Sequence, residues 1–418
     1  MAGRPLHALL LPPAAGPGRL LDALTAALDG TGPAILPLDP RLPPARVADL
    51  LQAFSPDVVE TAEGALRPSP PTAVTKPAGS RTDLPAEVAV VIATSGSTGE
   101  PKGVQLTAAA LLHSARASLD RLAARPGERW LCPLPVSHIA GLGVLVRSLV
   151  AGTDPVLTGR LDGGTDLAAL GCAHVSLVPA QLRRLLAAGA DLAAVRTILL
   201  GGAAVPPALL AAARAAGARV VTSYGMSETC GGCVYDGVPL TGVSVRTGDG
   251  GRIEIAGPVL FAGYRRQPGL TARALVDGWF VTSDVGAVDA SGQLSVHGRA
   301  DEMINTGGEK VAPGPVAAAL EECPQVAEAV VIGVPDPRWG ERVTAIVVPA
   351  DPRRPPALAV LRDAVAGRLP RHAAPQALVL VPEIPVLGPG KPDMAALVRL
   401  ASGVDLGIDE PRGNNHGR

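Results

Sequence analysis

Short apolar runs alternate with longer stretches in which apolar residues recur at helical spacing along the first half of the chain. The runs predict buried strands, and the longer stretches predict helices packed on them. Strands are expected at 7–11, 34–38, 88–93, 130–133, 155–158, 174–178, 197–200 and 219–223. Helices are expected at 18–28, 43–54, 108–124, 139–151, 179–188 and 206–216. This alternation predicts parallel α/β sheets.

The pattern changes after Tyr224, where short alternating runs are separated by Gly and Asp. These runs predict a small antiparallel β subdomain with strands at 243–246, 252–256, 280–282, 286–288 and 293–297. A further unit begins near Arg299, with helices expected at 315–323 and 357–368 and strands at 327–334, 343–348 and 377–381.

The expected fold class is α/β with two domains. Residues 1–298 would form a large N-terminal domain of mainly parallel sheets with helices plus the small antiparallel β subdomain. Residues 299–402 would form a small, mobile α+β C-terminal domain. Residues 403–418 are polar and rich in Gly, so a disordered tail is expected there.

Composition narrows the classes of partner. The net charge of −1 over 418 residues leaves no global field that would attract nucleic acid or anionic lipid, so a small molecule is the expected partner. No stretch approaches the roughly 18 uninterrupted apolar residues that a membrane helix needs, and the N-terminus lacks a signal-peptide pattern. A cytoplasmic protein without membrane insertion is therefore expected, and a homodimer is among the assemblies left open.

Five cysteines are too few and too dispersed for a disulfide framework. Cys230 and Cys233 form a Cys-x-x-Cys without the second pair that zinc requires. We expect these two residues to be small side chains near a tight turn.

The stretch Thr94 to Val104 packs four hydroxyls, three glycines and one lysine into eleven residues directly after an apolar strand. Glycines allow backbone N–H groups to turn toward an anion, hydroxyls add donors, and Lys102 supplies a positive charge. The stretch therefore predicts a phosphate loop, with an ordinary Ser/Gly connector as the alternative. It differs from the Walker pattern because no hydroxyl follows the lysine, so a metal ligand must come from elsewhere.

Three further polar clusters follow expected strands, where open α/β sheets bind ligands. Gly201-Gly202 would permit close approach of a planar ring, or would only form a turn into a helix. Tyr224 to Thr229 combines an aromatic ring with Glu228, a candidate Mg²⁺ ligand. Asp284 is expected to end an apolar strand, where it could take both hydroxyls of a ribose or cap a turn.

Two segments with charged residues belong to the proposed C-terminal domain, one at its start and one near its end. Arg299 to Glu302 lies at its boundary and would otherwise be read as solvated linker. Lys391 lies on a loop stiffened by Pro and Gly, which favours a functional lysine over a merely solubilising one.

In this order, the motifs TSGSTGEPKG, YGMSET, TSD, GRADE with its following GGEK, and the late GK resemble the adenylate-forming superfamily. That superfamily includes acyl-CoA ligases, luciferase and the adenylation domains of peptide synthetases. The resemblance runs from about Val88 to Lys391. The blocks LLGGA, SYGMSETCGGCVYDGV and INTGGEKV are most similar to the o-succinylbenzoate:CoA ligases of menaquinone biosynthesis.

The resemblance implies a role for each matching residue. The β- and γ-phosphates of ATP would be held by Thr94, Ser95, Gly96, Ser97, Thr98, Gly99 and Lys102. The adenine site would be formed by Gly202, Ala203, Tyr224 and Gly225. Asp284 and Arg299 would bind ribose or phosphate, Glu228 would bind Mg²⁺, and Asp301 would be the hinge. The remaining two roles fall to Lys391, which would bridge the acid and the α-phosphate, and His138, which would wall the acyl pocket.

The implied activity is an ATP-dependent carboxylic acid:CoA ligase that forms an acyl adenylate and then a thioester, with ATP, Mg²⁺ and coenzyme A. The favoured acid is o-succinylbenzoate. Another aryl- or acyl-CoA ligase and a stand-alone adenylation enzyme that loads a carrier protein are the alternatives. A nucleotide-binding regulator without activity is disfavoured because Lys391, Glu228 and Asp284 are all present. Pro392-Asp393 after the lysine departs from the family pattern and bears on docking of the C-terminal domain.

Overall fold

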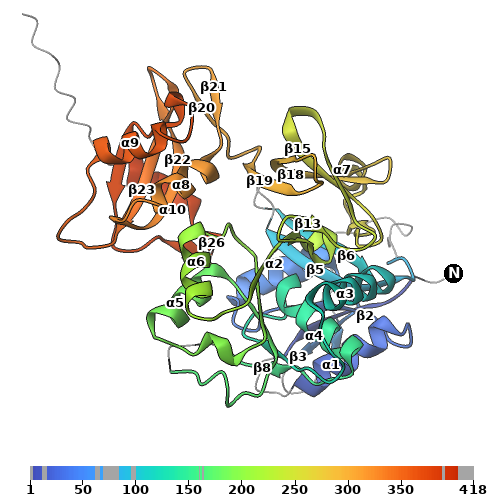
Figure 1. The fold of residues 1–418 in the computed structure, drawn as a ribbon. Coiled ribbons are helices and arrows are strands. Elements are labelled where there is room, and N and C mark those ends of the chain that lie inside the picture. Colours follow the sequence, from blue (N-terminus) through green and yellow to red (C-terminus); the bar gives the residue numbers. More distant parts are fainter. Residues whose placement is uncertain are drawn as a thin grey trace, which may run out of the picture. The chain divides into compact units, whose positions relative to one another are not determined.

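A computed structural model describes residues 3–11, 17–61, 66–68, 84–95, 100–159, 161, 164–387 and 391–402. The chain divides into two compact units, residues 1–296 and 297–418, close to the boundary expected after residue 298 (Figure 1). Part of the expected phosphate loop lies outside the described residues, namely Gly96, Ser97, Thr98 and Gly99, as does the expected tail 403–418.

The first sheet of unit one has the strand order β16-β6-β5-β2-β1-β3-β4. Its inner strands β1, β2, β3 and β5 pair in parallel, whereas β4, β6 and β16 are added antiparallel. The strands are β1 (Leu6–Leu10), β2 (Ala34–Pro37), β3 (Val58–Thr61), β4 (Leu66–Pro68), β5 (Val88–Ser95), β6 (Pro101–Thr107) and β16 (Gly263–Tyr264). The helices α1 (Pro17–Leu28) and α2 (Pro44–Phe54) connect its parallel strands.

The second sheet has the order β13-β12-β11-β10-β9-β7-β8, and its strands from β7 to β11 are parallel. The strands are β7 (Trp130–Cys132), β8 (Val156–Leu157), β9 (His174–Leu177), β10 (Thr197–Leu200), β11 (Val220–Met226), β12 (Gly231–Tyr235) and β13 (Val238–Pro239). The accompanying helices are α3 (Ala108–Leu122), α4 (Ile139–Ala151), α5 (Pro179–Ala187) and α6 (Pro207–Ala215).

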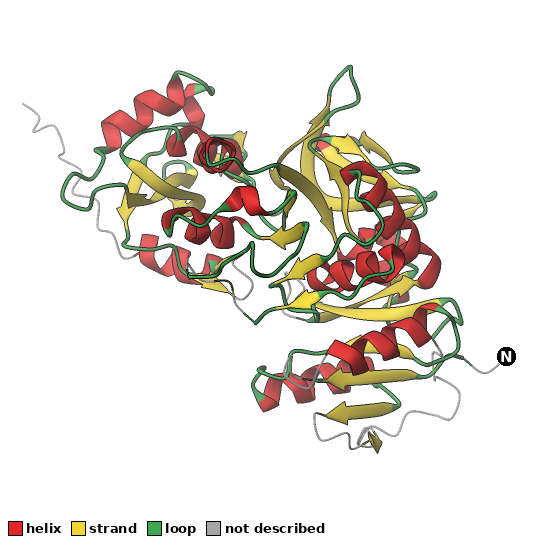
Figure 2. Cartoon of the chain, turned by 60° about the horizontal axis from the view of Figure 1, so that its bottom comes forward, coloured by secondary structure: helices red, strands yellow, loops and turns green. Residues whose placement is uncertain are grey.

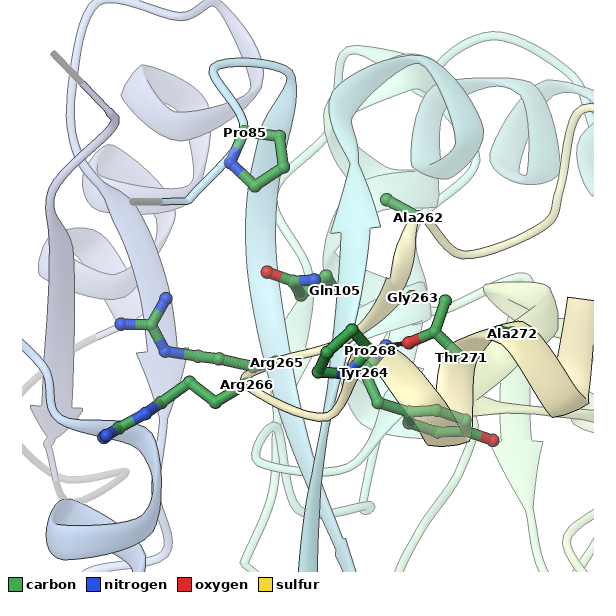
Figure 3. Close-up of a pocket in the computed structure, with 10 residues that line it drawn as sticks. All are labelled: Pro85, Gln105, Ala262, Gly263, Tyr264, Arg265, Arg266, Pro268, Thr271 and Ala272. Carbon is green, nitrogen blue, oxygen red and sulfur yellow. Dashed lines mark hydrogen bonds between the residues drawn. The ribbon is translucent and has the colours of Figure 1, made fainter. Parts of the chain in front are cut away.

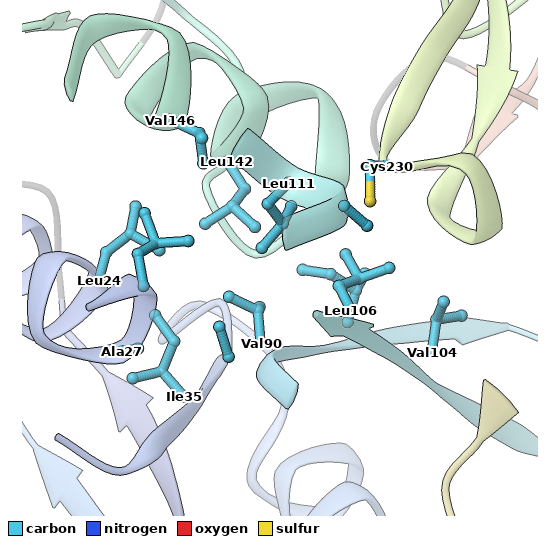
Figure 4. Packing of buried hydrophobic residues seen from close by; sticks show 14 of the residues in the cluster. Leu24, Ala27, Ile35, Val90, Val104, Leu106, Leu111, Leu142, Val146 and Cys230 are labelled. Carbon is cyan, nitrogen blue, oxygen red and sulfur yellow. The ribbon is translucent and has the colours of Figure 1, made fainter. Parts of the chain in front are cut away.

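The main core cluster joins helices to the first sheet (Figure 4). Leu24 of α1 and Ile35 of β2 pack with Leu106 of β6. Leu111 of α3 and Leu142 of α4 cover the same cluster, and neighbouring residues of both helices belong to a second cluster on the second sheet. The helices α3 and α4 are therefore apolar on two sides because they contribute to the cores of both sheets.

The small antiparallel sheet contains β14 (Ser244–Thr247), β15 (Arg252–Ala256), β17 (Leu275–Val276) and β18 (Trp279–Val288), with α7 (Pro268–Ala274) before β17. The strands expected at 280–282 and 286–288 are one continuous strand, so the prediction that Asp284 ends a strand is wrong. A register shift between β15 and β18 allows the ladder to continue past the polar residues Ser283 and Asp284. The strand β19 (Leu294–Arg299) contains the boundary between the units.

The second unit contains an antiparallel sheet of order β21-β20-β23-β22, to which β24 adds in parallel beside β23. Its strands are β20 (Ile304–Thr306), β21 (Glu309–Val311), β22 (Val326–Asp336), β23 (Gly340–Pro349) and β24 (Ala377–Leu380). Its helices are α8 (Pro313–Glu321), α9 (Leu358–Ala366) and α10 (Met394–Ser402), which Figure 1 labels; Figure 2 draws all helices in red. A separate hairpin pairs β25 (Val386–Leu387) with β26 (Lys391–Pro392).

The mixed α/β architecture, with a large first domain and a small α+β second one, confirms the predicted fold class. Within the described part of the chain, none of the helices combines the length and apolar character needed to cross a membrane. The expected mobility of the second domain stays a prediction.

Candidate functional site

The two ends of the expected phosphate loop lie on paired antiparallel strands, at the end of β5 and the start of β6. Strand β6 turns back on β5, so that Thr94 stands opposite Lys102, and Thr94 Oγ1 donates to the carbonyl oxygen of Lys102 at 3.4 Å. The sequence analysis expected no strand here, because Pro101, Lys102 and Gly103 suggest a turn rather than a ladder. Helix α3 begins only after β6, at Ala108, so no helix N-terminus follows the expected phosphate loop directly. The positive charge beside this loop is therefore that of Lys102.

Tyr264 joins Lys102 to Glu228. Its hydroxyl donates to Glu228 Oε1 at 2.8 Å, and Lys102 Nζ lies 5.7 Å from the centre of its ring. Burial, followed by the charge of Glu228, raises the pKa of Tyr264, so the phenol stays a donor. The sequence analysis missed this residue; its scarcity, as one of three tyrosines, was the available signal.

The backbone around Glu228 is fixed by a tight turn. Glu228 lies in the 3₁₀ helix η3 (Ser227–Thr229), and Thr229 Oγ1 accepts from the Met226 amide at 2.9 Å. Gly225 has φ of +156°, and a Cβ there would overlap the carbonyl oxygen of Gly231. Glycine is therefore required at Gly225 for the close approach of β11 and β12.

Tyr224 and Asp284 meet although sixty positions separate them in the chain. Tyr224 Oη donates to Asp284 Oδ2 at 2.7 Å, which joins β11 of the second sheet to β18 of the antiparallel sheet. Burial and then the charge of Asp284 raise the pKa of Tyr224, so its hydroxyl remains protonated. An aromatic ring beside a fixed carboxylate suits a nucleoside, whose base stacks and whose ribose offers two hydroxyls.

The turn after β10 holds the other two adenine candidates. A Cβ on Gly201 would overlap Ser223 Oγ on the neighbouring strand, and Gly202 has φ of +85°. Gly202 and Ala203 are exposed there. Because Gly201 and Gly202 have no side chains, the end of β10 stays open beside Ser223 and Tyr224 on the neighbouring strand.

His138 is the N-cap residue of α4 and is half-buried. Gly141, in the first turn of that helix, carries no side chain because a Cβ there would overlap the Pro135 carbonyl. The block that the sequence analysis assigned to the acyl pocket therefore forms a compact strand-to-helix turn that fixes where His138 stands.

Further along α4, Arg147 is 8 % exposed and thus a buried cation. Its Nη2 donates to Ser176 Oγ at 3.0 Å, and its guanidinium carbon lies 4.3 Å from the centre of the Trp130 ring. A Cβ on Gly143 would come within 3.4 Å of Nη1, so the side chain extends one turn back toward the His138 end of the helix.

The guanidinium of Arg147 is incompletely paired. Its Nε has no hydrogen-bond partner, and none of the carboxylates in the described ranges forms an ion pair with it. An unpaired charge in a protein interior is costly, and the partners that stabilise Arg147 among the described residues are the Ser176 hydroxyl and the face of the Trp130 ring. The sequence analysis did not select Arg147, since one Arg in an apolar helix gave no local motif.

Three candidates, Arg299, Asp301 and Lys391, belong to the second unit. Arg299 forms two hydrogen bonds with Asp301, Nε to Oδ1 and Nη2 to Oδ2, both 2.9 Å long. Glu302 lies 3.5 Å from the same guanidinium. Contact of Arg299 with a nucleotide would therefore require these ion pairs to exchange. Lys391 pairs with Leu387 through the backbone, and its side chain, like that of Ser95, lies outside the description.

The donor set fits a magnesium ion that is shared with phosphate. The described part of the chain holds no group of three or more His, Cys, Asp or Glu side chains that could bind a metal by themselves. Glu228 is half-buried, and its Oε2 has no hydrogen-bond partner within the described residues. Mg²⁺ commonly takes one or two carboxylates and completes its shell with phosphate oxygens and water, so one such carboxylate suffices. The five cysteines are free and buried.

A cavity of about 380 Å³ lies beside β16 and α7 (Figure 3). It is lined by Pro85, Gln105, Ala262, Gly263, Tyr264, Arg265, Arg266, Pro268, Thr271 and Ala272. Figure 3 shows the Tyr264 ring pointing away from the guanidinium groups of Arg265 and Arg266. None of the residues predicted from the sequence lines this cavity, and Tyr264 is the residue that it shares with the contacts around Glu228 and Lys102.

Comparison with known proteins places these features in a family. The AMP-binding enzyme family model matches residues 23–265, and the model of the AMP-binding enzyme C-terminal domain matches residues 316–391. A probable 2-succinylbenzoate–CoA ligase of Mycobacterium tuberculosis is 44% identical over 412 residues, which cover 95% of this chain and 99% of that protein. A feruloyl-CoA synthase of an Amycolatopsis species is 36% identical over 345 residues, 74% of this chain and 70% of that protein.

A solved structure of the o-succinylbenzoate CoA synthetase of Bacillus subtilis, in complex with the acyl-adenylate intermediate OSB-AMP, is also similar. It is 26% identical with a TM-score of 0.78, and the match covers 95% of this chain and 88% of that one. The family model spans more than half of the chain, and the first relative matches nearly all of it. The predicted superfamily is confirmed, and the chain belongs to the AMP-binding enzyme family.

Proposed function

We propose that the chain is an ATP-dependent, AMP-forming acid:CoA ligase whose acid is o-succinylbenzoate. The 44% identical relative with that activity in its name supports the proposal. The structural observation that carries the choice of acid is the buried, incompletely paired cation Arg147. The proposal includes a cytoplasmic location and leaves a homodimer open.

In the first half-reaction a carboxylate oxygen of the acid attacks the α-phosphorus of ATP, giving an acyl adenylate and pyrophosphate. Negative charge must be neutralised at the phosphates, which is the role we assign to Lys102 and to Lys391. Magnesium bound to Glu228 and phosphate oxygens would supply further charge neutralisation. Tyr224 would stack on the adenine beside Gly202, and Asp284 would accept from the ribose hydroxyls.

In the second half-reaction the thiol of coenzyme A attacks the acyl carbon and AMP leaves. Lys391 has no task in this step. We assign the change between the steps to a movement of the second domain at Asp301, which would carry Lys391 away from the acyl adenylate.

Arg147 favours an acid with two carboxylates. Only one carboxylate is joined to AMP, and the other stays ionised while the acid is in the site. Burying that second anion without a cation would cost several kcal/mol. Arg147 is a cation that is already buried, and no carboxylate within the described ranges pairs with it. Ser176 and Trp130 hold the guanidinium in place, which reduces the entropy lost when the acid binds.

The test compares two acids in Arg147→Met, a variant that keeps most of the side-chain volume and removes the charge. One acid is o-succinylbenzoate, and the other is 4-oxo-4-phenylbutanoate, which lacks the carboxylate on the ring. Loss of a buried charge pair costs about 2–4 kcal/mol, or roughly 30- to 1000-fold in kcat/KM. We expect that loss with o-succinylbenzoate and a small effect with the analogue, measured by pyrophosphate release.

Arg265→Met is the matched control. Arg265 is equally buried, at 8 % exposure, but its guanidinium is held by the carbonyl oxygens of Phe54 and Ser55. We expect this variant to leave the ratio of the two acids unchanged. Faster turnover of ferulate or indoleacetate than of o-succinylbenzoate by the wild type would refute the choice of acid, because relatives named for those acids also match this chain.

A further inference from the structure

The side chain of Tyr264 stands between two groups that the proposed function uses for different tasks. Lys102 belongs to the hairpin that would hold the phosphates, and Glu228 belongs to the turn that would hold Mg²⁺. Tyr264 contacts both, with its hydroxyl on Glu228 Oε1 at 2.8 Å and its ring 5.7 Å from Lys102 Nζ.

The sheet register explains the contact with Lys102. In the antiparallel pair of β16 and β6, Tyr264 stands opposite Val104. Lys102 is two residues from Val104 on the same strand, so its side chain leaves the same face of the sheet, diagonal to Tyr264. A cation within about 6 Å of an aromatic ring is attracted to its face, typically by about 0.5–2 kcal/mol.

The backbone near Tyr264 fixes the contact with Glu228. The amide of Phe261 donates to the carbonyl oxygen of Glu228 at 2.9 Å, and the rings of Phe261 and Tyr264 pack edge to face with centroids 4.8 Å apart. The Tyr264 amide donates to Thr271 Oγ1 at 2.8 Å. Tyr264 is 6 % exposed, so the ring has little freedom to leave this position.

We propose that Tyr264 is a positioning residue that sets the coordination of Mg²⁺ at Glu228 and couples it to Lys102. The hydroxyl donates to Oε1 and orients the carboxylate, which leaves Oε2 as the oxygen that would bind Mg²⁺. The same ring holds the Lys102 ammonium on the phosphate side. Metal and phosphate would thus be located relative to each other by one side chain. The inference rests on the proposed roles of Glu228 and Lys102, but not on the identity of the acid.

The first test is Tyr264→Phe, which keeps the ring and removes the hydroxyl. Mn²⁺ affinity is measured by electron paramagnetic resonance in the presence of a non-hydrolysable ATP analogue, without acid or coenzyme A. Loss of a hydrogen bond that orients a metal ligand commonly costs tenfold or more in metal affinity, so we expect about a tenfold weaker Mn²⁺ site. Affinity for the analogue at saturating Mn²⁺ should change less than threefold.

Tyr235→Phe is the matched control, because Tyr235 is also buried and its hydroxyl forms a 2.7 Å hydrogen bond with Ser118. It should leave Mn²⁺ affinity unchanged even if the thermal midpoint falls. Tyr264→Leu removes the ring as well, and should weaken binding of the analogue at least threefold beyond Tyr264→Phe.

Two outcomes would overturn the inference. If Tyr264→Phe binds Mn²⁺ like the wild type while Glu228→Gln does not, the tyrosine has no positioning role and the proposed function stands. If both variants bind Mn²⁺ like the wild type, the metal role of Glu228 is wrong and the inference falls with it. Equal Mn²⁺ losses in Tyr264→Phe and Tyr235→Phe would reduce the effect to general destabilisation, which also contradicts the inference.

Discussion

Glu128 is the centre of an ion-pair cluster at the starts of strands β7, β9 and β10 of the second sheet, and its replacement tests how much these ion pairs stabilise the fold. Glu128 accepts from the Arg125 amide at 2.8 Å, from Arg196 Nη1 at 2.6 and 2.7 Å, and from His174 Nε2 at 3.0 Å. Burial acts to raise the pKa of Glu128, but these hydrogen bonds outweigh it and lower the pKa from the ordinary 4.5 to about 2.

The magnitude follows from linkage between proton binding and folding. A fall in pKa from 4.5 to about 2 corresponds to about 3 kcal/mol of folding stability at neutral pH. Since the side chain is 18% exposed, water screens part of this, and we expect about 2 kcal/mol for Glu128→Gln. A carboxyl group whose pKa is lower in the folded state stabilises the fold when the pH is above its pKa in the unfolded state. That stabilisation is lost as the pH falls toward the pKa of the folded state.

The assay is the thermal midpoint of wild type and Glu128→Gln between pH 7 and pH 4, followed by circular dichroism. The wild type should melt about 3 °C higher at pH 7, and its advantage should shrink by about 0.8 kcal/mol by pH 4. His174 has its pKa lowered chiefly by burial, so both proteins also lose stability as the pH falls below about 6.5. Glu254→Gln, which breaks the more exposed pair with Arg246, is the control. A gap at pH 7 no larger than this control, or one independent of pH, would refute the reasoning.

Three further variants test the proposed site. Lys391→Ala should abolish formation of the acyl adenylate and leave thioester formation from a supplied acyl adenylate nearly intact; equal losses in both half-reactions would contradict its role. Tyr224→Phe removes the 2.7 Å hydrogen bond to Asp284 and should weaken ATP binding about threefold to tenfold in calorimetric titration, whereas an unchanged affinity would remove Asp284 from the ribose site. Gly225→Ala forces a Cβ against the Gly231 carbonyl and should lower the thermal midpoint by several degrees, with a normal midpoint showing that β11 and β12 can separate.

Periodicity predicted the elements whose burial follows from their own residues. The parallel strands β9 and β10 and the helices α3 and α4 appear close to where the apolar pattern placed them. The pattern failed where pairing with a distant segment decides the conformation. Strand β6 reads as a loop because its Pro and Gly disfavour a strand, and it forms one because β5 and β16 pair with its two edges.

The same distinction holds for the site. Glu228 and Tyr224 could be selected as candidates because each belongs to a local motif, and Asp284 was selected although its position within β18 was predicted wrongly. Arg147 and Tyr264 were missed because nothing near them in the sequence marks their partners. Arg147 contacts Trp130 and Ser176, which lie on other elements. Tyr264 is brought to Lys102 by the register between β16 and β6. Long-range pairing of this kind is a property of the fold and leaves no short pattern in the chain.

The placement of Arg147 has a consequence for how acid preference can evolve in this lineage. The residues around it on α4 belong to the cores of both sheets, with Val144 in one cluster and Val146 in the other. Replacing the cation would leave Trp130 and Ser176 without their partner inside the packed interior. A substitution at Arg147 therefore disturbs the packed core as well as the binding role that we propose for this residue. Selectivity for the acid should consequently drift more slowly than the surface of the same protein.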